Sequence, residues 1–464
     1  MAQHYKIHFD ISERKILLRF FDVFSVLIAL FIINVFFDFY YFNFDFQHIY
    51  WIAVLAFYIN VLGTVFEMYN LQVASNQFQI IKSIVLTTST TVLFYILTPF
   101  FTPVLPSNRL QILYFFIAVF FALLFWRIFY QKFIASYRFE KNVILICDRE
   151  QVQELVDGLK NIDPHFKIMG YVNADIEGNE GFKYDYIKNL ELEELANFVT
   201  KNHISEILIA TQKAGGITKP IFSELMRFLQ KGFVIREYTH VYELMTQRIP
   251  IQHFDKDFYR YFPFNRNNHN KLYLIIVRAL EFFISVFGLA FGCLLLPFIL
   301  VGNAFGNQGK LFYKQTRIGK NGKNFQIFKL RTMVQNAEQK GAVFAIPNDE
   351  RITKFGNFLR KSRIDEIPQF INILKNDMAL IGPRPERPVF VEELAEVMPF
   401  YNIRHVIKPG ITGWAQVNYA YGESISDSLV KLQYDLYYIK HRSVFLDIST
   451  LIKTFNTMLF YRGQ

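Results

Sequence analysis

The sequence predicts a membrane protein of mixed class. It combines four N-terminal transmembrane helices, a small Rossmann-like α/β domain, and a C-terminal domain with a re-entrant, proline-bent membrane helix. Three observations predict this: four long apolar runs come first, short β runs then alternate with helical patterns, and a fifth apolar run contains a proline. We expect domains at 1–140, 141–250 and 271–464, with a linker at 251–270.

Each of the four N-terminal runs is long enough to cross a bilayer core of about 30 Å as a helix. They cover roughly 16–37, 49–66, 78–101 and 110–130. Lysine and arginine precede the first run and follow the fourth, whereas the segment between the first two runs has neither. Positive charge is retained in the cytoplasm, so both ends of the block should lie there. Helices buried in a soluble core are the alternative, and this charge asymmetry disfavours them.

The second domain alternates strand-like and helical segments, which is typical of a small parallel sheet. The strand-like segments are 142–147, 166–172, 205–210 and 233–238. The first leads into "CDREQV" without a G-x-G-x-x-G pattern, so the phosphate-binding turn of a dinucleotide site is missing. A regulatory or spacer domain is favoured, and nucleotide binding is the alternative.

The fifth apolar run, about 272–301, contains Pro297 and precedes a basic stretch, 302–332, that has no acidic residue. If the run crossed the bilayer, this basic stretch would lie outside the cell, against the positive-inside rule. A helix that enters the membrane, bends at Pro297 and returns to the same face removes the conflict. Proline gives the bend a cause, because it removes one backbone hydrogen bond and clashes with the preceding turn.

The composition and net charge of the chain indicate which classes of binding partner to expect. The chain of 464 residues is 52% hydrophobic with a formal charge of +10, which suits an anionic membrane surface or phosphorylated substrates. No nucleic-acid-binding motif accompanies that charge, so a nucleic-acid partner is not expected. Cys147 and Cys293 predict neither a disulfide framework nor a metal site.

The stretch "SRIDEIPQFIN" at 362–372 places two carboxylates, Asp365 and Glu366, together. One interpretation is a helix cap, with Asp365 as N-cap and Pro368 at the third helical position, where proline is tolerated. The other is chemistry, because the same carboxylates would lie at the positive end of a helix, where phosphate is also attracted.

Cations that could bind phosphate surround this stretch in the sequence. Lys329 and Arg331 in "FKLRTM" would share one face of a strand, and prolines in "LIGPRPERP" would fix the direction of Arg384. Lys408 in "IKPGITGW" is the fourth candidate. Solvated surface charge is the ordinary explanation, but rigid Pro/Gly turns around an arginine favour a binding site.

These stretches carry a family resemblance. The segments "FYKQTRIGKNGKNFQIFKLRTM", "LRKSRIDEIPQFINILKNDMALIGPRPE" and "KPGITGWAQVN" resemble the bacterial sugar transferases, the monotopic polyprenyl-phosphate phosphoglycosyl transferases. The resemblance extends from about 271 to the C-terminus, in order and at the family's spacing. The leading helices and the α/β domain resemble the large subfamily that initiates exopolysaccharide repeat units.

The resemblance implies a monotopic catalytic domain at the cytoplasmic face of the bacterial inner membrane. It implies transfer of a sugar 1-phosphate from a UDP-sugar to undecaprenyl phosphate, with release of UMP and with Mg²⁺ as cofactor. By matching position, Asp365 is the nucleophile of a two-step reaction, Glu366 assists it, and both are candidate metal ligands. Leu296 precedes Pro297, where many family members have a serine, so the proline must bend the helix without a hydroxyl.

Two other functions remain as alternatives. A single-displacement, metal-dependent glycosyltransferase would use the acid pair of "FDKDF", Asp255 and Asp257, and would release UDP. A non-enzymatic scaffold or sensor of polysaccharide assembly would bind its signal in the α/β domain. The sequence identifies neither the sugar nor the oligomeric state, and a homo-oligomer is compatible with it.

Overall fold

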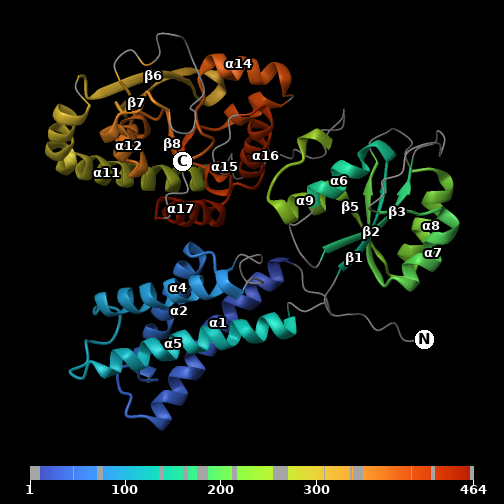
Figure 1. The fold of residues 1–464 in the computed structure, drawn as a ribbon, viewed down its shortest axis with the longest axis horizontal. Helices are drawn as coiled ribbons and strands as arrows, with labels where there is room; N and C mark the ends of the chain where they lie inside the picture. Colours follow the sequence, from blue (N-terminus) through green and yellow to red (C-terminus); the bar gives the residue numbers. More distant parts are fainter. Residues whose placement is uncertain are drawn as a thin grey trace. The chain divides into compact units, whose positions relative to one another are not determined.

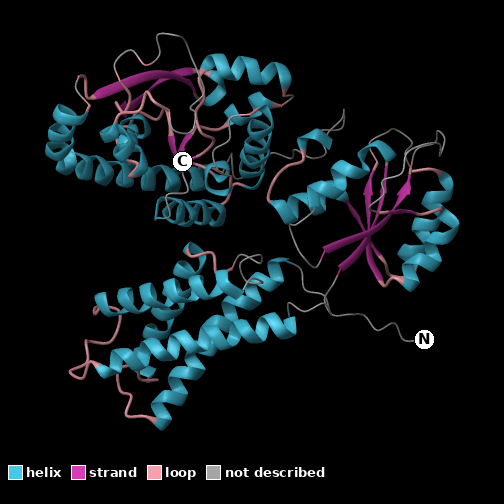
Figure 2. Ribbon diagram, viewed as in Figure 1, coloured by secondary structure: helices cyan, strands magenta, loops and turns pink. Residues whose placement is uncertain are grey.

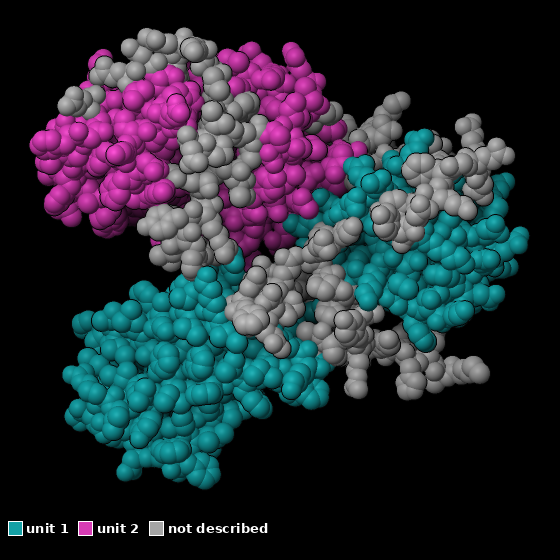
Figure 3. Space-filling view, viewed as in Figure 1, with its two compact units in different colours: residues 1–246 teal, residues 247–464 magenta. Residues whose placement is uncertain are grey.

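The computed structural model describes most of the chain, in two compact units that are treated separately below, Met1–Thr246 and Gln247–Gln464 (Figure 3). The described residues are 11–44, 46–69, 77–134, 141–159, 166–174, 187–211, 217–253, 270–307, 309–334, 337, 349–398, 400–419 and 424–459. Asp255 and Asp257, and most of the expected linker, lie outside them.

The four predicted N-terminal helices are confirmed, and each is long and apolar enough to cross a membrane. They are α1 (Ile11–Phe36), α2 (Ile49–Val65), α4 (Gln77–Leu97) and α5 (Leu110–Phe129). Phe42, Tyr95 and Phe115 pack in their common core. A buried ion pair joins α5 to α1, with Arg127 Nη2 at 2.6 Å from Asp22 Oδ2.

The α/β domain contains a parallel five-stranded sheet in the order β3-β2-β1-β4-β5. Figure 2 shows its strands in magenta with helices in cyan around them. Its strands are β1 (Lys141–Cys147), β2 (Phe166–Asn173), β3 (Lys188–Asn189), β4 (Ile204–Ala210) and β5 (Val234–Glu237). Two separate apolar clusters use α7 (Leu192–Lys201) with α8 (Lys219–Gln230), and α6 (Val152–Leu159) with α9 (Tyr238–Thr246). Helices therefore cover both faces, which confirms the predicted fold. Among the described strands β3 was not predicted, because two residues carry no periodicity, and helix α9 was not predicted either.

The C-terminal unit packs short elements against one long helix, α11 (Lys271–Gly306). Its strands form an antiparallel hairpin, β6 (Phe312–Ile318) with β7 (Asn324–Leu330), and a parallel pair, β8 (Ala379–Ile381) with β9 (Gly410–Thr412). Its other helices are α12 (Lys354–Lys361), α13 (Gln369–Leu374), α14 (Pro388–Val397), α15 (Trp414–Asn418), α16 (Ile425–His441) and α17 (Val444–Leu459).

The main apolar core of this unit surrounds Trp414 and Leu436. Ile249 and Ile251 lie in the same core, and Ile249 donates its backbone N–H to the carbonyl of Gln433. The segment that follows Thr246 is thus built into the C-terminal unit. The expected boundaries at 250 and 270 stay predictions.

Helix α11 is continuous over 36 residues with Pro297 inside it. The helix axis bends in the part of α11 that is close to its C-terminal end (Figure 1). Large apolar side chains such as Phe287 and Phe298 are exposed along it, as expected of a helix in contact with lipid. Re-entry to the same membrane face stays a prediction.

Candidate active site

The acid pair lies in a short irregular stretch between α12 and α13. Arg363 adopts the left-handed conformation (φ 58°), which ends the preceding helix, and Asp365 and Glu366 follow in the single 3₁₀ turn η8 (Ile364–Glu366). Pro368, and not Asp365, is the N-cap of α13, and no side chain caps that helix. The predicted N-cap role of Asp365 is therefore wrong, because its carboxylate lies one turn too early in the chain.

Two glycines of helix α11 allow this stretch to pack closely against the helix. A Cβ atom on Gly292 would lie 2.6 Å from Ile367 Cγ2, and one on Gly288 would lie 2.4 Å from Phe370 Cε2. Arg278 of the same helix donates to the carbonyls of Ile373 (2.7 Å) and Leu374 (3.0 Å) at the end of α13. The segment just after the acid pair thus packs directly against the long apolar helix α11.

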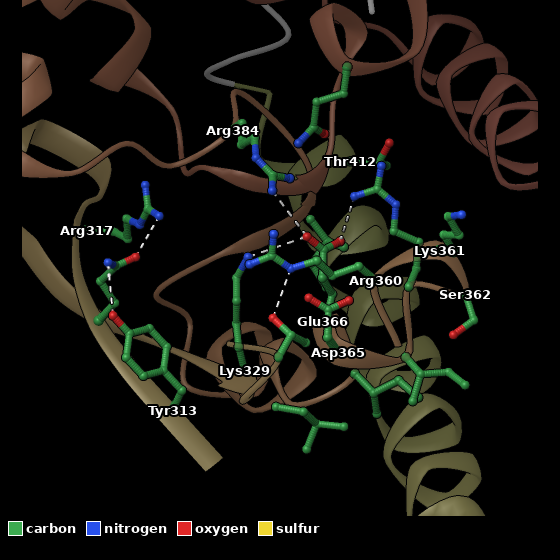
Figure 4. A pocket seen from close by; sticks show the side chains of 18 of the residues that line it. Tyr313, Arg317, Lys329, Arg360, Lys361, Ser362, Asp365, Glu366, Arg384 and Thr412 are labelled. Carbon is green, nitrogen blue, oxygen red and sulfur yellow. Dashed lines mark hydrogen bonds and ion pairs between the residues drawn. The ribbon is translucent and has the colours of Figure 1, made fainter. Parts of the chain in front are cut away.

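Glu366 is buried and surrounded by cations. Arg384 Nη2 lies 3.3 Å and Lys329 Nζ 3.6 Å from Glu366 Oε1, and Arg363 Nη1 lies 3.6 Å from Oε2 (Figure 4). Burial alone would raise the pKa of Glu366, but these three cations outweigh it and lower the pKa to about 2. Glu366 is therefore a permanent anion at physiological pH.

The pKa of Asp365 shifts in the opposite direction, although Asp365 is adjacent to Glu366 in the sequence. Burial, reinforced by the Glu366 carboxylate, raises the pKa of Asp365 to about 6 against the pull of Lys329, Arg360 and Arg363. Its Oδ1 is buried and accepts no hydrogen bond. Two neighbouring carboxylates whose pKa values are driven apart are typical of a site that performs chemistry.

Both acids line an open cavity of about 2020 Å³ within the C-terminal unit. One part of its wall is apolar and comes from α11, including Ile284, Phe287 and Phe291. Other lining residues include many lysines and arginines, so a molecule with a lipid tail and an anionic head would find both kinds of surface here.

The structure brings together only some of the predicted phosphate ligands. Lys329 and Arg384 reach the acid pair from two sides (Figure 4). Arg331 lines the cavity, but it donates to the backbone carbonyls of Lys310 (2.7 Å), Met333 (3.0 Å) and Asn307 around the end of α11. Lys408 is not among the described cavity residues, and its Nζ donates to Asn376 Oδ1.

The predicted shared strand face of Lys329 and Arg331 does not form, because β7 ends at Leu330. What holds Lys329 in place is Asn372, a buried residue of α13 that sequence reasoning missed. Its Oδ1 accepts from Phe328 N (3.0 Å) and its Nδ2 donates to Gln326 O (2.7 Å). The side chain thus occupies the free edge of β7, and no local sequence signal marks that contact.

Arg317 and Arg404 are two further cavity cations that the sequence did not single out. Arg363, beside the acid pair in "SRIDE", could have been found from its position alone. The other two come from distant segments, and only folding brings them to the site.

The residues present fit Mg²⁺ in a limited way. Among the described residues no three His, Cys, Asp or Glu side chains gather, and the acid pair offers two carboxylates. Mg²⁺ is commonly held by one or two carboxylates, with substrate phosphates and waters as the other ligands. The unpartnered, buried Oδ1 of Asp365 suits that arrangement, with Glu366 as second donor.

Comparison with known proteins agrees with the family resemblance of the sequence motifs. The sequence model of the bacterial sugar transferases matches residues 272–461, and that of a CoA-binding domain matches residues 64–214. A UDP-N-acetylgalactosamine-undecaprenyl-phosphate N-acetylgalactosaminephosphotransferase of Aeromonas hydrophila is 39% identical over 217 residues, 47% of this chain and 50% of that relative.

Two other relatives are similar over shorter lengths. A UDP-glucose:undecaprenyl-phosphate glucose-1-phosphate transferase of Escherichia coli is 42% identical over 150 residues, 32% of each chain. EpsL, an uncharacterized sugar transferase of Bacillus subtilis, is 34% identical over 194 residues, 41% of this chain and 90% of that relative. The match spans half or less of the first two relatives. Since it covers 90% of the third and the family's sequence model matches the whole C-terminal region, the chain belongs to the bacterial sugar transferase family.

Proposed function

We propose that this protein transfers a sugar 1-phosphate from a UDP-sugar to undecaprenyl phosphate at the cytoplasmic face of the membrane. UMP leaves, and undecaprenyl diphosphate-sugar, the first lipid-linked intermediate of a polysaccharide repeat unit, is formed. The observation that carries the proposal is the pair Asp365 and Glu366, buried in a cavity lined by many cations and by apolar residues of α11. The activities for which the Aeromonas and Escherichia relatives are named support the same reaction.

In the first step an oxygen of Asp365 attacks the phosphorus that carries the sugar. The bond from that phosphorus to the bridging oxygen breaks, UMP leaves with the bonding electrons, and Asp365 carries an acyl phosphate whose phosphorus still holds the sugar. A covalent intermediate of this kind divides one difficult transfer into two easier ones. The raised pKa of Asp365 indicates a carboxylate poorly stabilised by its surroundings, so little stabilisation is lost when it becomes bonded to phosphorus.

In the second step a phosphate oxygen of undecaprenyl phosphate attacks the same phosphorus. The bond between phosphorus and the Asp365 oxygen breaks, and the free carboxylate returns. The bond between the sugar and its phosphate is never cut. Both steps use the same site, and the apolar wall from α11 offers a place for the lipid while its phosphate faces the acid pair.

Glu366 and the surrounding cations supply the electrostatics. A carboxylate attacking a diphosphate is repelled unless positive charge lies between them. Lys329 and Arg384 provide that charge, and Glu366 keeps both in place in the absence of substrate. Mg²⁺, where bound at Asp365 and Glu366, would add neutralisation of the diphosphate oxygens.

The test uses the purified full-length protein in lipid nanodiscs with undecaprenyl phosphate and a panel of UDP-sugars. We expect UMP release that depends on the lipid and on Mg²⁺, and a sugar-phosphate adduct on Asp365 by mass spectrometry when the lipid is omitted. Asp365→Asn should abolish both, whereas Glu393→Gln, which removes an exposed acid on α14, should leave both intact.

Two outcomes would overturn the proposal. Release of UDP in place of UMP would favour a single-displacement glycosyltransferase. Absence of any nucleotide release across the panel would favour a scaffold or sensor.

A further inference from the structure

The segment that carries Arg384 is fixed at every carbonyl. From Pro383 to Glu386, four successive carbonyl oxygens each accept a hydrogen bond from a different donor. The donors are Gly410 N (2.9 Å), Arg404 Nη2 (3.0 Å), Arg317 Nη1 (3.2 Å) and Ile318 N (3.0 Å). Two of these donors are arginine side chains. Both arginines line the cavity, where they could bind an anion, but they donate to backbone carbonyls.

Arg404 holds the carbonyl of Arg384 itself, the residue whose guanidinium contacts Glu366. Arg404 is buried, and its other bonds run to Asp435 Oδ2 (2.8 Å) on α16 and to the Tyr401 hydroxyl (2.5 Å). A continuous series of contacts therefore leads from α16 through Arg404 and Arg384 to the acid pair.

The backbone around Arg404 is held in an uncommon conformation. Phe400, just before the 3₁₀ helix η9 (Tyr401–Val406), has a φ of 70°. The left-handed region is unfavourable for a bulky side chain, and such residues persist only where the surrounding structure enforces them. The chain therefore keeps an unfavourable conformation directly before the 3₁₀ helix that carries Arg404.

We propose that Arg404, anchored by Asp435, is a positioning residue that aims Arg384 at Glu366 and does not bind the substrate phosphate. Both terminal nitrogens of Arg404 already donate to protein groups. Only a planar guanidinium supplies several donors in a fixed fork, so lysine cannot replace it. The inference rests on the proposed transferase function, since it assigns a role within that site.

The test is a double-mutant cycle on the full-length protein in nanodiscs, measured as kcat/KM for UMP release. Arg404→Gln alone should lower kcat/KM about 10- to 100-fold, because a misplacement of about 1 Å has that effect on a reacting group. In an Arg384→Gln background the same substitution should lower it less than about threefold, because the residue it positions is already gone. A general loss of structure would lower activity equally in both backgrounds.

Two further variants keep the result interpretable. Removing Arg404 alone leaves the buried Asp435 carboxylate without its partner, so Arg404→Gln combined with Asp435→Asn is measured as well and should show the same non-additivity. Tyr438→Phe removes a buried hydrogen bond from α16 to Asp447 Oδ1 that does not involve Arg404. It should lower the melting temperature while kcat/KM changes less than about twofold.

Additive losses in the two backgrounds would overturn the inference, because Arg404 would then act independently of Arg384. Rescue by Arg404→Lys would also overturn it. These results differ from failure of the proposed function, in which the wild-type protein itself would release no UMP.

Discussion

Asp365→Asn should stabilise the protein above pH 6 while abolishing its activity. The folded state raises the pKa of Asp365 from 3.8 to about 6, so folding favours its protonated form. Its contribution to stability is complete below pH 4 and is lost as the pH rises through 6. The shift corresponds to about 3 kcal/mol as an upper bound at pH 7.5. Asparagine keeps the shape without the charge and removes this penalty.

The measurement is thermal unfolding of wild type and variant in nanodiscs across pH 4 to 7.5. For a unit of this size, each kcal/mol shifts the melting temperature by roughly 2–4 °C, so a gain of up to about 12 °C is expected at pH 7.5. The gain should shrink as the pH falls toward 4, where the wild-type carboxyl is protonated in both states.

Asp427→Asn is the matched control, because it removes an aspartate of opposite character. Asp427 completes the capping box of α16, and its hydrogen bonds, led by that from Ser424, lower its pKa to about 2. That variant should be less stable than wild type at pH 7.5. If Asp365→Asn were also less stable at that pH, or if its gain were the same at pH 4, the assignment of Asp365 as a buried, poorly stabilised carboxylate would be refuted.

Three other predictions follow from the geometry. Glu366→Gln removes a charge that raises the pKa of Asp365, so the acid limb of the pH–rate profile should move below pH 6; an upward movement would contradict the described pair. Gly288→Ala places a Cβ against the Phe370 ring and should reduce kcat up to about 100-fold, with recovery when Phe370→Leu is added; wild-type kcat in the single variant would count against this packing. Lys408→Met should raise the KM for the UDP-sugar less than about twofold, since Lys408 is not among the described cavity residues, and a tenfold increase would restore it as a phosphate ligand.

The local sequence pattern was sufficient to predict the secondary structure that depends on residues close together in the chain. Apolar length predicted the four N-terminal helices, and alternating periods predicted the parallel sheet, because both patterns record which faces avoid water. Local pattern failed at the acid pair, where it favoured Asp365 as a helix cap. Arg363 in the left-handed conformation and packing against α11 decide that turn, and neither is visible in the residues of the turn itself.

The sequence alone determined that this is a membrane protein of the sugar transferase family, and it located the two acids on which the proposed chemistry depends. The tertiary structure decided which cations serve them. Lys329 and Arg384 reach Glu366, Arg331 turns to the end of α11, and Lys408 lies elsewhere. The reason is physical: a guanidinium can donate to a phosphate or to a buried carbonyl, and only the folded backbone determines which of the two lies within its reach.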